Sequence, residues 1–471
     1  MKRALSILIG MTIDSGDTAW VLASAALVLL MTPGLAFFYG GMVRAKSVLN
    51  MMMMSFGAMA SVGVVWVLWG YSEAFGNSWN GLIGNPFQHF GLSNLLSKDS
   101  IFGYVAASNG APAHGGIPAL AFVAFQAVFA IITVALISGA IADRTKFSTW
   151  MVFTVVWATI VYFPVAHWVF AFDGYAADKG GWIANQLKAI DFAGGTAVHI
   201  NAGAAGLALA LVIGRRVGFR KEPMRPHNLT LVMLGAGLLW FGWFGFNAGS
   251  ALGANNTAAV TWVNTMVATA AAAIGWLATE RYRDGHATSL GAASGIVAGL
   301  VAITPSCSAV TPVGAIAIGV IAGVVCALAV GLKFRFGFDD SLDVVGVHLV
   351  GGIVGTLAIG FFASASAPAG VDGLFYGGGV DQLWRQAVGA FAVLAFSFVL
   401  TYAIGTVLAK VLGFRVERDA EVAGIDLDQH AETSYDLGTL SGGSRFGGSP
   451  PPAGTPAATP QPATTTQGAP V

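Results

Sequence analysis

The sequence has little charge. Only 10% of its 471 residues are Asp, Glu, Lys or Arg, whereas 55% are hydrophobic. A soluble domain has about 25% charged residues, so most of this surface is not expected to face water. Acidic and basic residues balance to a formal net charge of zero, which gives no indication of nucleic-acid binding. The composition favours a membrane protein.

Cysteine is also scarce. Cys307 and Cys326 are the only two, and both lie in or beside apolar stretches. They form neither a metal-binding cluster nor a disulfide framework, so we interpret them as small hydrophobic residues in helices. Glycine, in contrast, occurs 63 times, which suits helices that pack closely in lipid.

Long apolar stretches predict an all-α polytopic protein, since a transmembrane helix requires about 20 mostly apolar residues. Such stretches lie near residues 18–41, 50–75, 117–140, 148–171, 193–214, 229–252, 258–279, 287–304, 313–332, 342–363 and 386–412. We therefore expect about eleven transmembrane helices in the plasma or inner membrane of the cell, in contact with lipid.

Basic residues are concentrated in alternate connections between these stretches. One set of loops contains Arg44, Lys46, Arg144, Lys146, Arg215, Arg216, Arg220, Lys221, Arg225, Arg281, Arg283, Lys333, Arg335, Lys410, Arg415 and Arg418. The other loops contain little beyond Lys98, Lys179, Lys188 and Arg385. Because basic loops stay in the cytosol, we expect the N-terminus outside and the C-terminus inside.

The two ends of the chain differ from the apolar part. Residues 1–16 begin with Lys2 and Arg3 before a short apolar run, which is typical of a signal-like leader. Residues 17–414 are the predicted transmembrane domain, and 415–436 a cytosolic segment. Residues 437–471 are rich in Gly, Pro, Ala and Thr, so we expect them to be disordered.

An internal repeat relates the fifth and tenth predicted helices. Each has a histidine followed by glycines four and seven residues later, which are His199, Gly203 and Gly206, then His348, Gly352 and Gly355. A weaker match relates residues 38–41 to residues 246–249. The repeat unit is then five helices, and an odd number of crossings inverts one unit relative to the other, with a site between them near the midplane.

The two histidines are the first candidate site. Ionisable groups inside a bilayer are costly and usually functional, although one such histidine could merely bond a backbone carbonyl. Two at equivalent repeat positions favour function, and the repeat predicts that His199 and His348 approach each other. Neutral imidazoles each offer one donor and one acceptor, so this pair could pass a small neutral hydrogen-bonding molecule.

Aromatic residues near the outer helix ends are the second candidate site. They are Phe125, Phe129, Trp168, Phe170, Trp243 and Phe246, and Ser250 accompanies them. An interfacial aromatic belt is the alternative interpretation. A cation-π cage with a hydroxyl would suit ammonium, which both attracts aromatic faces and donates hydrogen bonds.

Two aspartates precede the histidine helices. Asp191 is well placed as the N-cap of the fifth helix, and its charge would also attract a cation. We expect Asp343, five residues before His348, to be its approximate counterpart at the inner mouth, together with Phe38.

Three segments resemble signatures of the Amt/MEP/Rh ammonium transporter family, prokaryotic Amt type. They read DFAGGTAVHIN at residues 191–201, GWFGFNAGS at residues 242–250 and DVVGVH at residues 343–348. The resemblance extends over residues 17–435. It implies the Amt/Rh fold, a homotrimer with one pore per subunit, no cofactor or metal, and ammonium or ammonia as the substrate for nitrogen uptake.

The resemblance also implies roles for individual residues. Ammonium would be recruited by Phe129, Phe170, Trp243 and Ser250, with Asp191 beside them. Phe129 and Phe246 would form a gate, and His199 and His348 would line the pore that conducts ammonia. In the cytosolic segment, Glu421, Gly424, Asp426 and Tyr435 match the family's regulatory tail, which makes a PII-type signalling protein a candidate partner.

One position departs from the family pattern. Phe170 stands where the family usually has tryptophan, and phenylalanine has a weaker quadrupole and no indole donor. We expect a weaker recruitment site unless Trp168 turns inward.

Three other functions are alternatives for a polytopic membrane protein. A sodium-coupled carrier typically has broken helices at matching positions in its two halves, but Pro33 and Pro164 are not equivalent. A membrane enzyme lacks support because no activated nucleophile or metal-ligand spacing is present. An ammonium sensor of the same fold with little flux stays open, although the tail is short for an output module.

Overall fold

The computed structural model describes residues 13–103 and 116–435. The predicted leader at residues 1–16 lies mostly outside this range, and the predicted tail at residues 437–471 lies wholly outside it. Residues up to 434 belong to one compact unit. The fold is that of this unit.

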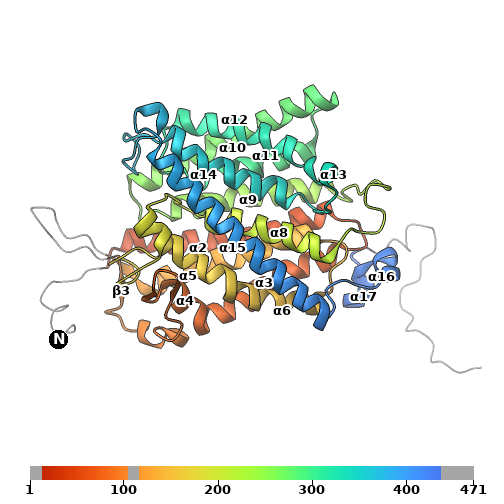
Figure 1. Ribbon diagram of the computed structural model, residues 1–471, viewed down its shortest axis with the longest axis horizontal. Coiled ribbons are helices and arrows are strands. Elements are labelled where there is room, and N and C mark those ends of the chain that lie inside the picture. Colours follow the sequence, from red (N-terminus) through yellow and green to blue (C-terminus); the bar gives the residue numbers. More distant parts are fainter. Residues whose placement is uncertain (1–12, 104–115, 436–471) are drawn as a thin grey trace, which may run out of the picture. The chain divides into compact units, whose positions relative to one another are not determined.

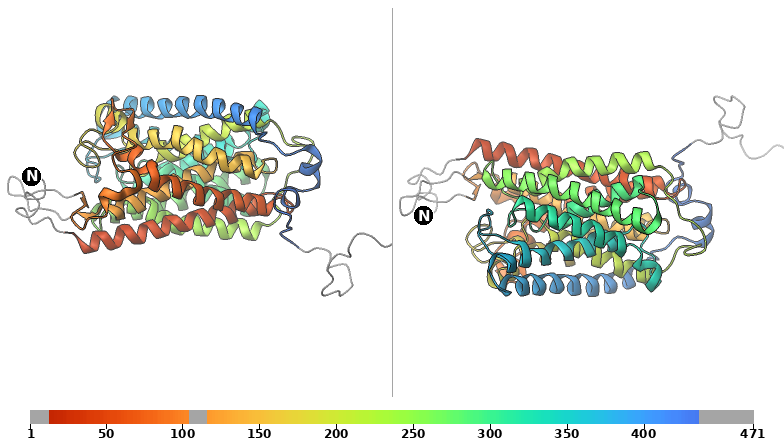
Figure 2. Two further views of the ribbon diagram at one scale, coloured as in Figure 1. Left: turned by 90° about the horizontal axis from the view of Figure 1, so that it is seen from below. Right: turned by 90° about the horizontal axis from the view of Figure 1, so that it is seen from above.

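Helices make up nearly all of the unit and run side by side (Figures 1 and 2). The segments that match the predicted spans are, in chain order, α2 (Ser15–Met42), α3 (Val48–Val65) continued by η1 (Trp66–Gly70) and α4 (Tyr71–Phe75), α5 (Ala119–Ile137) with η3 (Ser138–Ile141), α6 (Phe147–Trp157) with η4 (Ala158–Tyr162) and α7 (Phe163–Phe170), η6 (Gly195–Ile200) with α8 (Asn201–Ile213), α9 (Leu229–Gly249), α10 (Asn256–Asp284), α11 (Ser289–Ile303), α12 (Pro312–Ala329) with α13 (Leu332–Phe336), η7 (Val345–Leu349) with α14 (Val350–Phe362), and α15 (Asp381–Val411).

Ten of these helical segments are long and apolar enough to cross a membrane. The one remaining segment, α11, is apolar but has only 15 residues, which span about 22 Å at 1.5 Å per residue. Most of its side chains are buried against other helices, so it belongs to the interior of the bundle. The described residues thus form an all-α membrane protein, as the apolar stretches predict.

Short elements close both ends of the bundle. Two small antiparallel hairpins follow α4: β1 (Ser78–Trp79) pairs with β2 (Ile83–Gly84), and β3 (Ile101–Phe102) pairs with β4 (Ile117–Pro118). The remaining short helices are η2 (Phe90–Leu95), η5 (Ile183–Leu187) and η8 (Leu374–Tyr376). At the opposite end, α16 (Arg418–Ala423) and α17 (Ile425–His430) follow α15 (Figure 1).

Side-chain caps fix where several helices begin. Asn228, Asn255, Thr288 and Thr311 each accept a hydrogen bond from a backbone N–H in the first turn of α9, α10, α11 and α12. Such caps satisfy donors that have no partner within the helix. The helices are therefore delimited by local sequence as well as by burial.

Reciprocal contacts relate the two halves of the unit. In the antiparallel pair α2 and α9, a Cβ added to Gly41 would meet Val232, and one added to Gly249 would meet Ser24. The segments η6–α8, which contains His199, and η7–α14, which contains His348, are the first and second histidine helices. Where they cross, Gly203 lies against Leu349 and Gly352 lies against Ile200. In both helices the glycine four residues after the histidine meets the residue that follows the partner histidine. An inverted five-helix repeat requires this reciprocity.

Both histidines lie in π-helical turns. His199 is in η6 and His348 is in η7. Single π-helical turns are rare and occur frequently at functional sites. The repeat therefore places two uncommon turns at the centre of the bundle.

Candidate functional site

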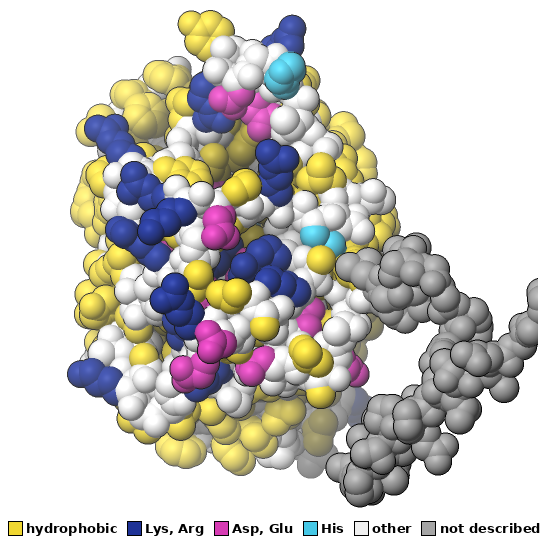
Figure 3. All heavy atoms as spheres, turned by 90° about the vertical axis from the view of Figure 1, so that its right-hand side faces the viewer, with side chains coloured by type: hydrophobic (Ala, Val, Ile, Leu, Met, Phe, Trp, Pro, Cys, Tyr) yellow, Lys and Arg dark blue, Asp and Glu magenta, His cyan; other side chains and the backbone are white. Residues whose placement is uncertain are grey.

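The two ends of the bundle differ in composition. The basic end is the end where residues 43–47, 142–146 and 214–228 connect helices, and Lys and Arg side chains gather there (Figure 3). The aromatic end is the opposite one, where Phe170 ends α7 and Ser250 follows α9. The candidate site extends from the aromatic end toward the basic end.

Asp191 holds the start of the first histidine helix. Its two carboxylate oxygens accept hydrogen bonds from the N–H groups of four successive residues, 194 to 197, at 2.7–3.1 Å. Burial raises the pKa of Asp191, and these four donors oppose that rise. Asp191 thus satisfies the free donors of the first turn, as predicted for a cap, but the N-cap position itself is Gly194 and not Asp191. Both carboxylate oxygens are engaged by these bonds.

The counterpart of Asp191 in the second half is Asp340 and not Asp343, which corrects the prediction. Asp340 accepts hydrogen bonds from Val344 N at 3.1 Å and Val345 N at 2.7 Å. Asp343 instead adopts a positive φ of 63°, as Gly194 does in the first half. The sequence contained the signal, because Asp191 and Asp340 each precede their histidine by eight residues.

The two histidines meet as the repeat predicts. Their Nδ1 atoms lie 3.3 Å apart, and the ring centroids are separated by 5.3 Å at an angle of 19°. Both side chains are buried. Nε2 of His199 is also buried and has no hydrogen-bond partner in the described part of the chain. An unpaired buried polar atom is costly, so this nitrogen is suited to contact a small hydrogen-bonding ligand.

A narrow cavity of about 10 Å³ lies beside the histidine pair. Its lining is apolar apart from the two imidazoles and one indole, and consists of Met31, Leu35, Phe38, Ile132, Leu136, Val198, His199, Leu239, Trp243, Phe246, Val297 and His348. A cavity of roughly 10–15 Å³ is the minimum that holds one water molecule. The space therefore suits a single molecule of that size at a time.

A stacked pair of phenylalanines separates this cavity from a wider pocket. The rings of Phe129 and Phe246 lie 4.2 Å apart at an angle of 25°. Phe246 lines the narrow cavity, whereas Phe129 lines the wider pocket. The arrangement implied for these two residues by the family resemblance is therefore present.

Trp243 lies on the histidine side of the phenylalanine pair, so its predicted place in the outer aromatic cluster is corrected. Its indole stacks on His199 at 5.4 Å and 16°. Its Nε1–H donates to Thr304 Oγ1 at 2.8 Å. Trp243 precedes Phe246 in α9 by almost one helical turn, and both side chains line the narrow cavity. Sequence spacing alone does not show on which side of the phenylalanine pair Trp243 lies.

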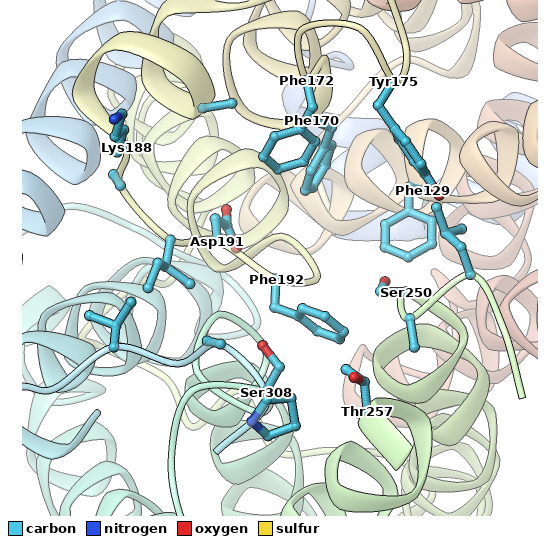
Figure 4. Close-up of a pocket in the computed structure, with 18 of the residues that line it drawn as sticks. Phe129, Phe170, Phe172, Tyr175, Lys188, Asp191, Phe192, Ser250, Thr257 and Ser308 are labelled. Carbon is cyan, nitrogen blue, oxygen red and sulfur yellow. The ribbon is translucent and has the colours of Figure 1, made fainter. Parts of the chain in front are cut away.

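The wider pocket opens at the aromatic end and has a volume of about 730 Å³. Phe129, Phe170 and Ser250 line it as predicted, and Asp191 lies at its side (Figure 4). Phe125 and Tyr175 also line it. Phe125 is part of the predicted aromatic cluster, whereas Tyr175 lies in a loop that gave no sequence signal.

The hydroxyl of Ser250 is oriented to accept a hydrogen bond from a ligand. Its own proton is donated to the carbonyl oxygen of Phe246, one turn earlier, at 2.9 Å. The lone pairs of Ser250 Oγ are then available to an N–H donor in the pocket. The faces of Phe129 and Phe170, whose centroids lie 6.5 Å apart, complete a site with features suited to a donating cation.

Trp168 does not turn toward this pocket. Its Nε1–H donates to the carbonyl of Leu82 at 2.6 Å, and its ring packs on Trp182 and Phe396. Phe170 is therefore the aromatic residue that α7 contributes to the pocket.

Few charged side chains line the wide pocket. Asp381 and Arg385 pair with each other at 2.7 Å, and Asp191 is occupied by backbone donors. Lys188, held at a positive φ of 58°, is exposed, and its side chain has no hydrogen bond or ion pair within the described residues. It is the one lining cation without a counter-charge in that part of the chain.

At the basic end, Asp343 pairs with Lys333. The Lys333 ammonium lies 2.7 Å from Asp343 Oδ1 and also donates to the carbonyl oxygen of Asp340 at 3.0 Å. Phe38, predicted to share the inner mouth, lines the narrow histidine cavity instead. Asp343 does not line that cavity, so the two residues occupy different levels.

The cytosolic segment contacts loops at the basic end. Glu421 is buried and accepts from Val217 N at 2.6 Å and from Arg415 Nη2 at 2.7 Å. Asp426 accepts from Leu49 N and Asn50 N in the first turn of α3. Asp426 therefore supplies the cap that α3 lacks from its own residue Ser47.

Gly424 joins these two contacts. It has a φ of 136°, and an added Cβ would lie 2.9 Å from Cβ of Lys46. Glycine is therefore required by both conformation and space. Tyr435, the fourth predicted tail residue, falls in the second unit of the chain.

The described residues contain no group of three or more His, Cys, Asp or Glu side chains that could hold a metal ion.

Comparisons with known proteins agree with this geometry. A profile of the Ammonium Transporter Family matches residues 19–435. An ammonium transporter of Mycobacterium tuberculosis is 63% identical over 438 residues, which cover 91% of this chain and 92% of the relative. One from Aquifex aeolicus is 48% identical over 427 residues, covering 90% and 94%.

Solved structures are similar as well. Saccharomyces cerevisiae Mep2 matches with a TM-score of 0.76 and 34% identity, covering 87% of this chain and 89% of its own. A structure described as a sensor Amt protein matches with a TM-score of 0.78 and 30% identity, covering 88% and 98%.

Proposed function

Because this chain belongs to the Ammonium Transporter Family, whose members are membrane transporters and not enzymes, we propose a specific route for its substrate. Ammonium binds in the wide pocket among Phe129, Phe170 and Ser250. It gives a proton to water at the Phe129–Phe246 pair, ammonia passes His199 and His348 toward the basic end, and a proton is returned to the ammonia there. That end faces the cytosol, as the distribution of basic residues indicates.

The observation that most supports this proposal is the change of environment across the phenylalanine pair. On one side lies a wide pocket with aromatic faces and an accepting hydroxyl. On the other lies a cavity of about 10 Å³ lined by apolar groups and the histidine pair. A charged ion loses its hydration in such a cavity at high cost, whereas ammonia is neutral and can hydrogen bond to the imidazoles.

Solid-supported membrane electrophysiology tests the route. Purified protein in liposomes is given an ammonium jump, and the double variant His199→Ala/His348→Ala is measured beside it. We expect a transient current in the wild type that potassium does not produce and that the double variant loses or makes unselective. The His89→Ala variant is the control, because His89 lies at the aromatic end and lines neither cavity.

A pH-sensitive dye inside the liposomes separates two forms of transport. Alkalinisation without current would indicate electroneutral passage of ammonia. A current that the double variant retains with its selectivity would exclude the histidine pair from the route.

An ammonium sensor is the second candidate function. The likeness to the structure described as a sensor Amt protein supports it, with 30% identity over 88% of this chain. A sensor would bind ammonium with little flux. Binding in the absence of both current and alkalinisation would therefore favour the sensor over the transporter.

The assembly and the tail complete the proposal. The family resemblance supports a homotrimer with one pore in each subunit. The bonds from Glu421 to Val217 N and from Asp426 to the start of α3 couple the cytosolic segment to loops at the basic end. A PII-type protein that displaced this segment would act on those loops, and removal of residues 415–434 is expected to alter flux.

A further inference from the structure

A second large hollow lies at the basic end, away from the histidine cavity. Its volume is about 520 Å³, which falls in the usual range for small-molecule sites. Its walls come from the loop that joins α8 to α9 and from α13, with Ser341 beside them. We name it the basic pocket, lined by Arg216, Phe219, Arg220, Lys221, Glu222, Pro223, Met224, Lys333, Phe334 and Ser341.

Two of its four cations are fixed by the fold. Arg216 is buried and pairs with Asp143 at 3.0 Å and with Asp339 at 2.9 Å. Burial alone would raise the pKa of Asp339, yet the hydrogen bonds from Arg216 and the charge of Arg144 hold it below the usual range. Lys333 pairs with Asp343. These contacts give one wall of the basic pocket a set geometry.

The other two cations are not engaged. Arg220 and Lys221 are exposed, and no hydrogen bond or ion pair within the described residues involves their side chains. Arg220 adopts a positive φ of 64°. Glu222 is the only acidic residue in the lining. The basic pocket therefore has an excess of positive charge that comes from adjacent residues in a single loop.

An aromatic surface completes the basic pocket. The rings of Phe219 and Phe334 stack at 5.9 Å with an angle of only 10°. Phe219 is largely buried, whereas half of Phe334 is exposed. A ligand could therefore place an anionic group on Arg220 and Lys221 and an apolar or flat group against Phe334.

We propose that the basic pocket binds a phosphate-bearing anion larger than phosphate itself. Guanidinium and ammonium groups are the usual partners of phosphate oxygens, and arginine can bind two of them at once. The phosphate comes either from a soluble compound such as a nucleotide or from the headgroup of an anionic lipid. Lys333 gives such a ligand a physical connection to Asp343 and Asp340, at the start of the second histidine helix.

Calorimetry on the full chain in lipid nanodiscs tests this site. Pyrophosphate and ADP are titrated into protein in phosphatidylcholine nanodiscs. A parallel set of nanodiscs contains phosphatidylglycerol, and thermal stability is the readout there. The test variant is Arg220→Gln/Lys221→Gln, which changes two exposed side chains and is not expected to disturb folding. The matched control is Arg281→Gln/Lys410→Gln, which removes the same charge from exposed positions outside the basic pocket.

We expect the test variant to weaken binding by about tenfold or more, since it removes the charge-assisted hydrogen bonds that two cations would donate to the phosphate. Binding of ADP or pyrophosphate that only the test variant loses would support a soluble ligand. Stabilisation by phosphatidylglycerol alone, again lost only in the test variant, would support a lipid. Absence of both effects, or an equal loss in the control, would overturn the proposal. Because binding is measured without ammonium, these outcomes are independent of transport.

Discussion

The two histidine helices begin with the same backbone geometry but are stabilised differently. Asp191 accepts four backbone hydrogen bonds at the aromatic end, whereas Asp340 accepts two at the basic end. Three residues after each aspartate the chain has a positive φ, at Gly194 in the first half and at Asp343 in the second. The two positions therefore share a positive φ, at 113° for Gly194 and 63° for Asp343, but differ in their side chains.

This difference shows which features the inverted repeat constrains. The cap and the positive φ set the direction in which each π-helical turn starts, and both are required for the histidines to meet. The side chain at the positive-φ position is not constrained in the same way. At the basic end it is an aspartate that binds Lys333, and at the aromatic end it is a glycine packed against Val198.

Removing the caps is expected to have the largest effect. Hydrogen bonds to a charged acceptor contribute about 1.5–3 kcal/mol each, so Asp191→Ala should destabilise the protein by roughly 4 kcal/mol or more and Asp340→Ala by roughly half as much. Thermal denaturation of the purified protein in detergent measures both. The Asn variants are controls, because the amide has one acceptor oxygen and should retain part of each cap. Equal losses from the two Ala variants would contradict the comparison.

Exchanging the residues at the positive-φ position should have a smaller effect. An added Cβ at Gly194 would lie 2.6 Å from Val198 Cγ2 in a conformation that disfavours side chains, so Gly194→Ala should cost about 2 kcal/mol. Asp343→Gly should be nearly neutral, since the relief of backbone strain offsets the lost pair with Lys333. The same thermal assay compares them. Tolerance of Gly194→Ala equal to that of Asp343→Gly would contradict the requirement for glycine at position 194.

Charges at the two ends provide a third comparison. The ammonium group of Lys333 is paired, whereas that of Lys188 has no partner among the described residues and lines the pocket proposed to recruit a cation. Lys188→Gln should therefore increase the apparent affinity for ammonium by about threefold at low ionic strength, the range expected for an exposed charge. The gain should disappear in high salt because of screening. Currents from liposomes measure it, with Lys179→Gln as the control outside the pocket.

Much of this architecture could be predicted from the sequence. The apolar stretches located the helices because a membrane requires length and hydropathy together. The repeated spacing of histidine and glycine predicted that His199 and His348 meet. The apolar stretches and the histidine–glycine spacing could both be recognised because each is a pattern within a single helix.

Other features depend on contacts that the sequence does not encode locally. The bond between Asp426 and the start of α3 joins residues 376 positions apart. The position of Trp243 beside the narrow cavity depends on how α9 packs against the helix that contains His199. Hydrophobic periodicity gave no sign of the π-helical turns. The repeated eight-residue spacing to histidine identifies Asp340, but Asp343, three residues later, begins the segment that resembles the family signature and so favours the wrong aspartate.

The smallest effect is expected from Phe170→Trp at the aromatic end. Phe170 lines the wide pocket with its ring near Phe129, and tryptophan offers a stronger quadrupole to a cation, worth about 0.5–1 kcal/mol at exposed sites. The apparent affinity for ammonium should therefore rise by about twofold. Trp168→Phe is the matched control, because Trp168 lies two residues away but bonds Leu82 and packs on Trp182. That variant should reduce stability and leave affinity unchanged. If Phe170→Trp had no effect on affinity, or if both variants changed it alike, recruitment would not depend on the aromatic face that α7 presents to the pocket.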